Sequence, residues 1–203
     1  MARSDISDVT RAALVQAAVH EFAAHGFDGA STRAIASRAG VHQPQINYHF
    51  ASKLELWRAA VDELFEELNA ETAAAMDSEL DDRDALAAGV RAFVRHAARR
   101  PELNRIMVRE SGAPSERLEW LVDTYVRDRF ELVARLWHRL RRRGEVIDID
   151  ALTAFYLMLG GGTLLYTNAP EARLLSETDP NQPTHIERHA NALVSMLFNQ
   201  RTP

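Results

Sequence analysis

The chain has 203 residues, of which 46% are hydrophobic and 26% are charged, and its formal net charge is −5. This length accommodates one large domain, or a small domain attached to a larger one. The absence of cysteine excludes disulfides, thiolate metal sites and cysteine catalysis. No apolar stretch approaches the roughly 20 residues of a membrane-spanning helix, and the first ten residues are polar. We therefore expect a soluble protein of the cytoplasm with no membrane partner.

The charge is distributed unevenly along the chain. Residues 1–53 hold five basic and four acidic side chains, whereas residues 54–203 hold nineteen and twenty-five. A neutral-to-basic head on an acidic body fits local contact of the head with DNA. A difference of this size is also expected by chance, so the charges support this interpretation only weakly.

Three short helices are predicted at the start of the chain. Apolar residues at helical spacing indicate a first helix that runs to about His25 and is ended by Gly26. A second helix over residues 32–39 has Ser31 as its N-cap. The third must begin just before Pro44, because proline is tolerated only in the first turn of a helix.

The second and third of these helices carry the pattern of a helix-turn-helix. Ala36 is small enough for a crossing helix to pass close above it, and Gly40 can adopt the positive φ that the turn requires. Ile46 then returns an apolar side chain to the shared core. An alanine, a glycine four residues later and an aliphatic residue ten later are typical of a DNA-binding helix-turn-helix.

Beyond this motif the pattern stays helical, and no alternating strand pattern occurs. Ser52 and Glu55 predict a capping box for a fourth helix over residues 53–76, which would link the head to the rest of the chain. Further helices are expected at about 83–100, 102–111, 115–143, 151–167 and 184–200.

The helix predicted over 151–167 is apolar nearly all round and contains three consecutive glycines, Gly160 to Gly162. Either another helix approaches closely at these glycines or the helix breaks there, and the sequence leaves both open. Residues 168–183 are expected to form a loop, after which Thr184 and Glu187 predict a second capping box. The two apolar helices at the end of the chain suggest a homodimer interface, the alternative being that they complete the body's core.

One short region of the sequence resembles the TetR (tetracycline-repressor) family of bacterial transcription regulators. The resemblance lies in residues 10–57 and is carried by Ile35-Ala36, Ala39-Gly40-Val41, Tyr48-His49-Phe50, Ser52-Lys53 and Leu56. It implies an all-α homodimer with a DNA-binding head, residues 1–53, and a ligand-binding and dimerisation body, residues 54–203. The chain departs from the family at His42, Gln43 and Asn47, which leaves the operator sequence unpredictable.

Candidate DNA-binding residues lie in the second and third predicted helices. Gln43, Gln45 and Asn47 can each donate to and accept from a base edge, and Pro44 can rest on a thymine methyl group. The alternative is a polar helix end without a function.

The resemblance assigns Tyr48, His49 and Lys53 to phosphate contacts, although Tyr48 and His49 could instead pack internally. Thr32 and Arg33, at the start of the second helix, are further candidates, Thr32 for a phosphate and Arg33 for a base edge.

A small organic effector is expected to bind in a cavity of the body, between the helices predicted over 83–100, 102–111 and 115–143. Aromatic, polar and adaptable side chains near the predicted cavity make five candidates: Phe93, His96, Met107, Tyr125 and Arg129. Each could equally belong to ordinary core or surface.

The sequence contains no recognisable catalytic constellation and predicts no cofactor and no metal site. His185 and His189 are four residues apart on the last helix, a spacing that also suits surface residues. The leading hypothesis is a repressor that binds a near-palindromic operator DNA as a homodimer through 151–167 and 184–200, and is released by its effector. The alternatives are an activator of the same architecture, or an interaction or enzymatic body whose head does not read DNA.

Overall fold

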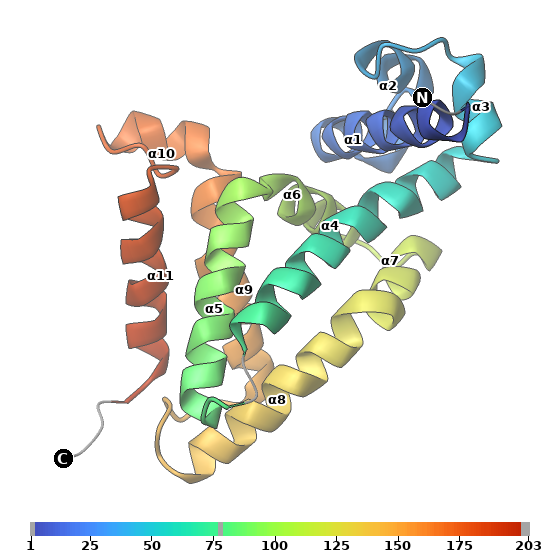
Figure 1. Cartoon of the computed structure of the whole chain (residues 1–203). Helices are drawn as coiled ribbons and strands as arrows, with labels where there is room; N and C mark the ends of the chain where they lie inside the picture. The colour runs from blue at the N-terminus through green and yellow to red at the C-terminus, as the bar shows by residue number, and fades with distance from the viewer. Residues whose placement is uncertain (1–2, 77–78, 200–203) are drawn as a thin grey trace.

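The computed structural model describes residues 3–76 and 79–199, and it confirms the all-α architecture for these ranges (Figure 1). Apart from helices and turns they contain one isolated β-bridge, between Val146 and Phe198. The elements are α1 (Arg3–Gly29), α2 (Thr32–Arg38), α3 (Pro44–His49), α4 (Lys53–Ala75), α5 (Asp82–Arg99), α6 (Pro101–Glu110), α7 (Glu116–Leu121), the π-helical segment η1 (Val122–Val126), α8 (Arg127–Arg142), α9 (Ala151–Thr167), α10 (Ala169–Leu175) and α11 (Pro183–Leu197).

The head consists of α1, α2 and α3, which lie together at one end of the molecule (Figure 1). The predicted break at Gly26 is confirmed. Gly26 has the non-helical angles φ 71° and ψ 177° and kinks α1 there, although a short helical segment, which was not predicted, follows and runs to Gly29. Ser31 caps α2 as expected, since its Oγ accepts a hydrogen bond of 3.3 Å from the Ala34 N–H.

The turn between α2 and α3 has the predicted geometry. Gly40 has φ +70°, in the left-handed region that favours glycine. Val41 then donates its N–H to the Ala36 carbonyl at 3.0 Å, which closes the turn. A Cβ at Gly40 would meet no atom within 4 Å, so the backbone conformation, and not lack of space, requires glycine here.

Helix α4 leaves the head and runs diagonally along the body (Figure 1). Ser52 Oγ accepts a hydrogen bond of 3.1 Å from the Glu55 N–H, as a capping box requires. Glu55 Oε2 accepts from the N–H of Ala51 at 2.7 Å, not from that of Ser52, so the reciprocal bond reaches one residue further than predicted.

The single long helix expected over 115–143 contains a change of helix type. It starts at the Ser115 N-cap as α7, passes through five π-helical residues in η1, and continues as α8. Short π-helical segments inside α-helices often occur at functional sites. Helical periodicity in the sequence indicates a helix but does not distinguish these two hydrogen-bonding patterns.

Helix α9 continues through its three glycines, so close packing, not a break, explains two of them. A Cβ at Gly161 would lie 2.9 Å from Leu193 Cδ1 of α11. One at Gly162 would lie 2.8 Å from Phe93 Cε1 of α5. Gly160 faces open space, where no atom would lie within 4 Å of a Cβ.

The chain between α9 and α11 differs from the prediction. Residues 168–183 were expected to be a loop, but they include α10, which begins at Ala169 and buries that side chain against the body. The predicted capping box at Thr184 and Glu187 is also wrong. Helix α11 begins one residue earlier, at Pro183, and Glu187 instead accepts two hydrogen bonds from Arg95 of α5, at 2.6 and 2.7 Å.

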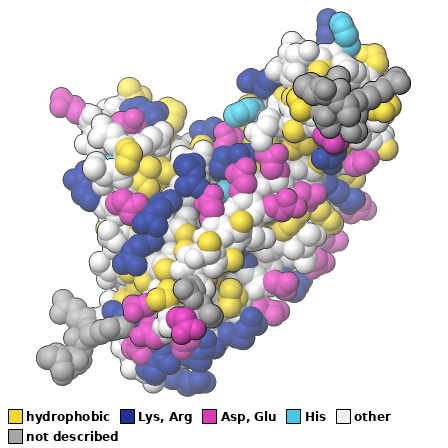
Figure 2. Space-filling view, in the orientation of Figure 1, with side chains coloured by type: hydrophobic (Ala, Val, Ile, Leu, Met, Phe, Trp, Pro, Cys, Tyr) yellow, Lys and Arg dark blue, Asp and Glu magenta, His cyan; other side chains and the backbone are white. Residues whose placement is uncertain are grey.

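Two hydrophobic cores hold the molecule together. One lies mostly among α1 to α4 but also contains Leu103 and Ile106 of α6 and Leu121 of α7. The other joins α5, α8, α9 and α11 and surrounds Trp137. On the outside, acidic side chains gather over α4 and arginines gather around the end of α8 (Figure 2).

Candidate nucleic-acid interface and body cavity

Helix α3 is anchored by one side and leaves the other side free. Ile46 is its buried residue, and the C-cap Phe50 is buried as well. The candidates Gln43, Pro44, Gln45 and Asn47 are all exposed. A short helix held by its apolar side, with amide side chains on the outside, has the geometry needed to enter a major groove.

Gln45 has a structural role that sequence reasoning missed. Its Oε1 accepts a hydrogen bond of 3.0 Å from the backbone N–H of His42, in the turn before α3. The side-chain NH2 group stays available as a donor. Gln43 occupies the N-cap position without making a side-chain cap bond, so its whole amide is available.

The three phosphate candidates differ in how free they are. The Tyr48 side chain is 77% exposed, and its ring touches the half-buried ring of His49 edge-on at 5.0 Å. Lys53 is half-buried, with Nζ donating to the Asp28 carbonyl at 3.3 Å and lying 5.1 Å from the centre of the Phe27 ring. These contacts hold the Lys53 ammonium group close to the head.

The two candidates on α2 follow its N-cap. Arg33 is exposed, whereas Thr32 is half-buried. Arg33 therefore has the freer side chain of the pair.

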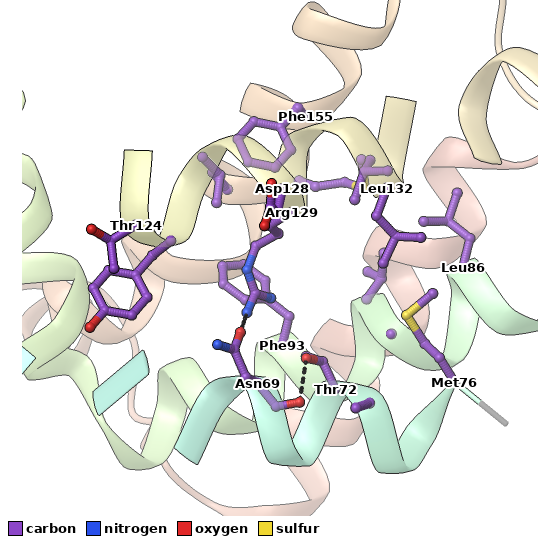
Figure 3. Close-up of a pocket in the computed structure, with 17 residues that line it drawn as sticks. Asn69, Thr72, Met76, Leu86, Phe93, Thr124, Asp128, Arg129, Leu132 and Phe155 are labelled. Atoms are coloured by element: carbon purple, nitrogen blue, oxygen red, sulfur yellow. Dashed lines mark hydrogen bonds between the residues drawn. The ribbon is translucent and has the colours of Figure 1, made fainter. Parts of the chain in front are cut away.

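The body contains a cavity of about 560 Å³ between α4, α5, η1, α8 and α9 (Figure 3). This volume lies within the usual range for small-molecule sites, roughly 300–1,000 Å³. Its walls are mostly apolar, and the polar groups among them come from α4, η1 and α8. The lining side chains shown by name are Asn69, Thr72, Met76, Leu86, Phe93, Thr124, Asp128, Arg129, Leu132 and Phe155.

The structure brings three of the five predicted effector residues into this cavity and leaves two outside it. Phe93, Tyr125 and Arg129 line the cavity, and their part in ligand binding stays a prediction. His96 is only 1% exposed and is packed between α4 and α5, with Nδ1 3.2 Å from Glu71 Oε2. Met107 packs against the core that includes the head. The placement of these two residues at the cavity was therefore wrong.

Tyr125 joins the cavity wall to α4. Its hydroxyl donates a hydrogen bond to Asp62, and its ring stacks on Phe65 with 4.3 Å between the ring centres. Burial, together with this hydrogen bond to a carboxylate, raises the pKa of Tyr125. The phenol therefore remains a hydrogen-bond donor at neutral pH.

A line of touching aromatic rings connects the head with the cavity wall. Phe27 of α1 touches Trp57 of α4 at 6.1 Å between ring centres, and Trp57 touches Trp120 of α7 at 5.7 Å. Trp120 touches Tyr125 at 5.6 Å. Because these rings are rigid and in contact, a displacement of the cavity wall can be transmitted through them to the head.

A second exposed feature is apolar. Leu152, Tyr156 and Leu164 of α9 lie along one face at intervals of four and eight residues, and each is at least 55% exposed. Met196 of α11 is also exposed. Exposed apolar side chains gathered on one helix face are typical of protein interfaces.

The two histidines of α11, His185 and His189, do not have equivalent surroundings. His189 Nδ1 lies 2.9 Å from the Tyr166 hydroxyl, so this ring has a partner within the fold. Within residues 3–76 and 79–199 no three or more histidine or acidic side chains are grouped as a metal site would require. None of the helices in these ranges combines the length and apolarity needed to span a bilayer.

Comparison with known sequences concerns the N-terminal part of the chain. Residues 14–60 match the family model described as bacterial regulatory proteins, tetR family. The transcriptional activator FasR of Mycolicibacterium smegmatis is 37% identical over 86 residues, which cover 42% of this chain and 39% of FasR. The regulatory protein RaaS of Mycobacterium tuberculosis is 41% identical over 73 residues, 36% of this chain and 34% of RaaS. The matches thus span well under half of either relative.

Comparison with solved structures concerns nearly the whole fold. A crystal structure of AibR in complex with isovaleryl coenzyme A and operator DNA superposes with a TM-score of 0.75. The match covers 93% of this chain and 98% of AibR at 16% sequence identity. At this identity the likeness establishes a common arrangement of helices.

Proposed function

Because residues 14–60 match the model of the tetR family of bacterial regulatory proteins, we propose that the chain is a TetR-type DNA-binding transcriptional regulator controlled by a small molecule. The observation that carries the proposal is the free side of α3, with Gln43, Gln45 and Asn47 exposed on a helix that Ile46 anchors. Residues 1–53 act as the DNA-binding head, and residues 54–203 form the body that binds the effector and the second subunit.

In this proposal α3 reads base edges in the major groove. Gln43 and Asn47 offer complete amides, which suit the adenine edge, while Gln45 contributes its NH2 group. Pro44 supplies apolar contact. Tyr48, with His49 and Lys53, contacts phosphate, as does Thr32 at the start of α2. Arg33, which follows Thr32, reaches a base edge.

The regulator works as a homodimer through α9 and α11. The exposed apolar residues of α9, with Met196 of α11, supply a surface that a second copy would bury. Two heads can then occupy two half-sites, about 34–36 Å apart, of a near-palindromic operator. The acidic side chains over α4 favour contact with DNA through the head alone (Figure 2).

The cavity holds the effector, and α4 transmits its binding. Tyr125 of the cavity wall is bonded to Asp62 of α4 and is the last of the aromatic rings that lead back to Phe27 in the head. An effector that prefers one spacing of the heads changes DNA affinity by its differential binding, typically ~1–3 kcal/mol. We propose release of a repressor as the outcome.

Activation is the second candidate, and one observation favours it. FasR, which is 37% identical over 86 residues, is named a transcriptional activator. The same two-headed architecture can either repress or activate transcription, because the outcome depends on where the operator lies relative to the promoter.

Selection of bound sites from a random DNA pool at stated salt tests the proposal. The wild type should enrich a near-palindromic sequence. The double variant Gln43→Ala, Asn47→Ala should lose that enrichment while keeping its thermal unfolding midpoint, because neither side chain makes a hydrogen bond within the described chain. Gln45 is left intact because it also caps the turn.

A matched control is Gln182→Ala, which removes an exposed amide at the start of α11. It should enrich the same sequence as the wild type. Undiminished specific binding by the double variant would contradict the assigned role of α3. No enriched sequence from the wild type would favour an interaction or enzymatic body with a head that does not read DNA.

A further inference from the structure

The cavity has one cationic side chain among mostly apolar walls. Arg129 of α8 extends between Asn69 on one side and the aromatic ring of Phe155 on the other (Figure 3). Its Nη2 donates a hydrogen bond to Asn69 Oδ1, a neutral acceptor. Its Nε is removed from solvent and has no hydrogen-bond partner among the described residues. A buried guanidinium donor without a partner is costly, so the site is chemically incomplete.

The neighbouring arginines of the same helix show how unusual this is. Arg127 pairs with Asp123 at 2.6 Å, Arg135 with Glu131 at 3.6 Å, and Arg139 with Asp82 at 2.6 Å. Arg129 forms no ion pair within residues 3–76 and 79–199.

The surroundings of Arg129 are unfavourable for its charge. Burial lowers the pKa of Arg129, and no carboxylate offsets that effect. A ligand that brings a negative charge would supply the missing partner.

We propose that the effector is an amphiphilic monocarboxylate, with its carboxylate on Arg129 and its apolar part against Phe93, Phe155 and Met158. The inference rests on the proposed function, since it takes the cavity as the effector site. A guanidinium matches a carboxylate through two parallel N–H donors, and Nε with one Nη forms such a pair. The aromatic and thioether side chains supply the apolar wall.

The one acidic side chain among the described residues that line the cavity limits the charge of the ligand. Asp128 also lines it and is exposed. A ligand with two negative charges would place one of them near this carboxylate, which is unfavourable. A ligand with a single negative charge, placed at Arg129, therefore matches the charges of the cavity wall best.

Binding of the carboxylate would alter the connection between α8 and α4. The Arg129 Nη2 that now donates to Asn69 of α4 is one of the donors a bound carboxylate would use. Competition for this donor loosens Asn69, which lies on the helix that leads to the head. The charge of the ligand thereby affects α4, the helix to which the hydrogen bond between Tyr125 and Asp62 also connects the cavity wall.

The experiment measures binding to the DNA-free full chain by isothermal titration calorimetry, using three probes with the same eight-carbon chain. Octanoate should bind saturably and about tenfold or more tighter than octan-1-ol, because a charge-assisted hydrogen bond adds to the same apolar contact. Octylamine should bind more weakly than octan-1-ol. No saturable octanoate binding, or an alcohol that binds as tightly, would overturn the proposal.

Three variants test whether Arg129 is the residue that binds the carboxylate. Arg129→Met keeps an unbranched, flexible side chain but removes the guanidinium group, and replacing an unpaired buried charge is expected to leave the fold intact. It should reduce octanoate affinity about tenfold or more and leave octan-1-ol affinity within about twofold. Arg129→Lys should retain the preference for octanoate over the alcohol.

The matched control is Arg135→Met, which removes an exposed arginine six residues along the same helix and should change neither affinity beyond about twofold. Equal loss in both arginine-to-methionine variants would contradict a specific role of Arg129. Because DNA is absent, a chain that selects an operator but shows no octanoate preference refutes this inference and leaves the DNA-binding proposal standing.

Discussion

Gly162 of α9 lies directly against the Phe93 ring of α5, so close that a Cβ at this glycine would be 2.8 Å from Phe93 Cε1. The absence of a side chain on one residue therefore sets the position of an aromatic ring that lines the cavity. This contact also explains a glycine inside a helix, where glycine is otherwise unfavourable by about 1 kcal/mol relative to alanine.

The contact predicts opposite effects for two neighbouring glycines. Gly162→Ala should destabilise the protein by about 1–3 kcal/mol, because the new methyl group overpacks a well-filled site. Gly160→Ala should be neutral or stabilising by up to about 1 kcal/mol within one subunit, since its Cβ would meet no atom of the same chain. Urea unfolding of both variants at one protein concentration measures the difference. Equal effects would contradict the close approach at Gly162.

The second prediction concerns the turn of the helix-turn-helix. Gly40 has φ +70°, so Gly40→Ala should cost about 1–2 kcal/mol of stability although there is room for the methyl group. Gly40→Asn should cost less, because asparagine tolerates the left-handed region better. Thermal unfolding of the two variants is the measurement. An alanine variant as stable as the asparagine one would show that the turn relaxes to another conformation.

The third prediction concerns pH. Burial lowers the pKa of His96, with Glu71 opposing the shift, so the folded state holds this ring neutral at pH values where the unfolded chain, with a pKa of about 6.5, binds a proton. The stability from this residue is present above about pH 6.5 and is lost as the pH falls through the lowered folded pKa. The slope should be at most about 1.4 kcal/mol per pH unit for one histidine.

Urea unfolding between pH 7.5 and pH 5.5 checks this expectation. The variant His96→Gln should lose less stability over this interval than the wild type. The exposed His138 offers the control His138→Gln, which should follow the wild-type curve. Part of the dependence should remain in the His96 variant, because burial also lowers the pKa of His189. Parallel curves for wild type and His96→Gln would rule out His96 as the source.

The fourth prediction tests the proposed dimer. Leu164→Asp places a charge on the exposed apolar face of α9, where the side chain is 59% exposed, and should shift the protein to monomers. Val108→Asp changes a similarly exposed residue, 62%, on α6 and should leave the dimer intact. Sedimentation velocity distinguishes the two outcomes. A dimer that survives the Leu164 change would place the interface elsewhere.

Local signals in the sequence were enough to predict much of the helical fold. The caps at Ser31 and Ser52, the proline start of α3 and the glycine turn all depend on residues within a few positions of each other. The extra helix α10 was missed because its proline- and asparagine-rich sequence is also typical of loops. The π-helical η1 leaves no distinct periodicity over five residues.

The cavity was harder to predict, because it depends on how far each helix is displaced along its neighbours. Phe93 and His96 lie one turn apart on α5, yet only Phe93 reaches the cavity, while His96 is buried beside Glu71. Asn69 and Phe155 line the cavity without any local signal in the sequence. The bond from Gln45 to the turn before α3 was equally invisible, because glutamine has no strong preference as a cap.

The three body side chains that complete the head's core, Leu103, Ile106 and Leu121, bear on how such proteins could be recombined. A chimera that joins α1 to α4 of this chain to a foreign body would lose these contacts and leave apolar surface of the head in water. A transplanted head would therefore need α6 and α7 as well, or matching apolar residues in the recipient. The unit available for exchange is thus larger than the segment that carries the DNA-binding motif.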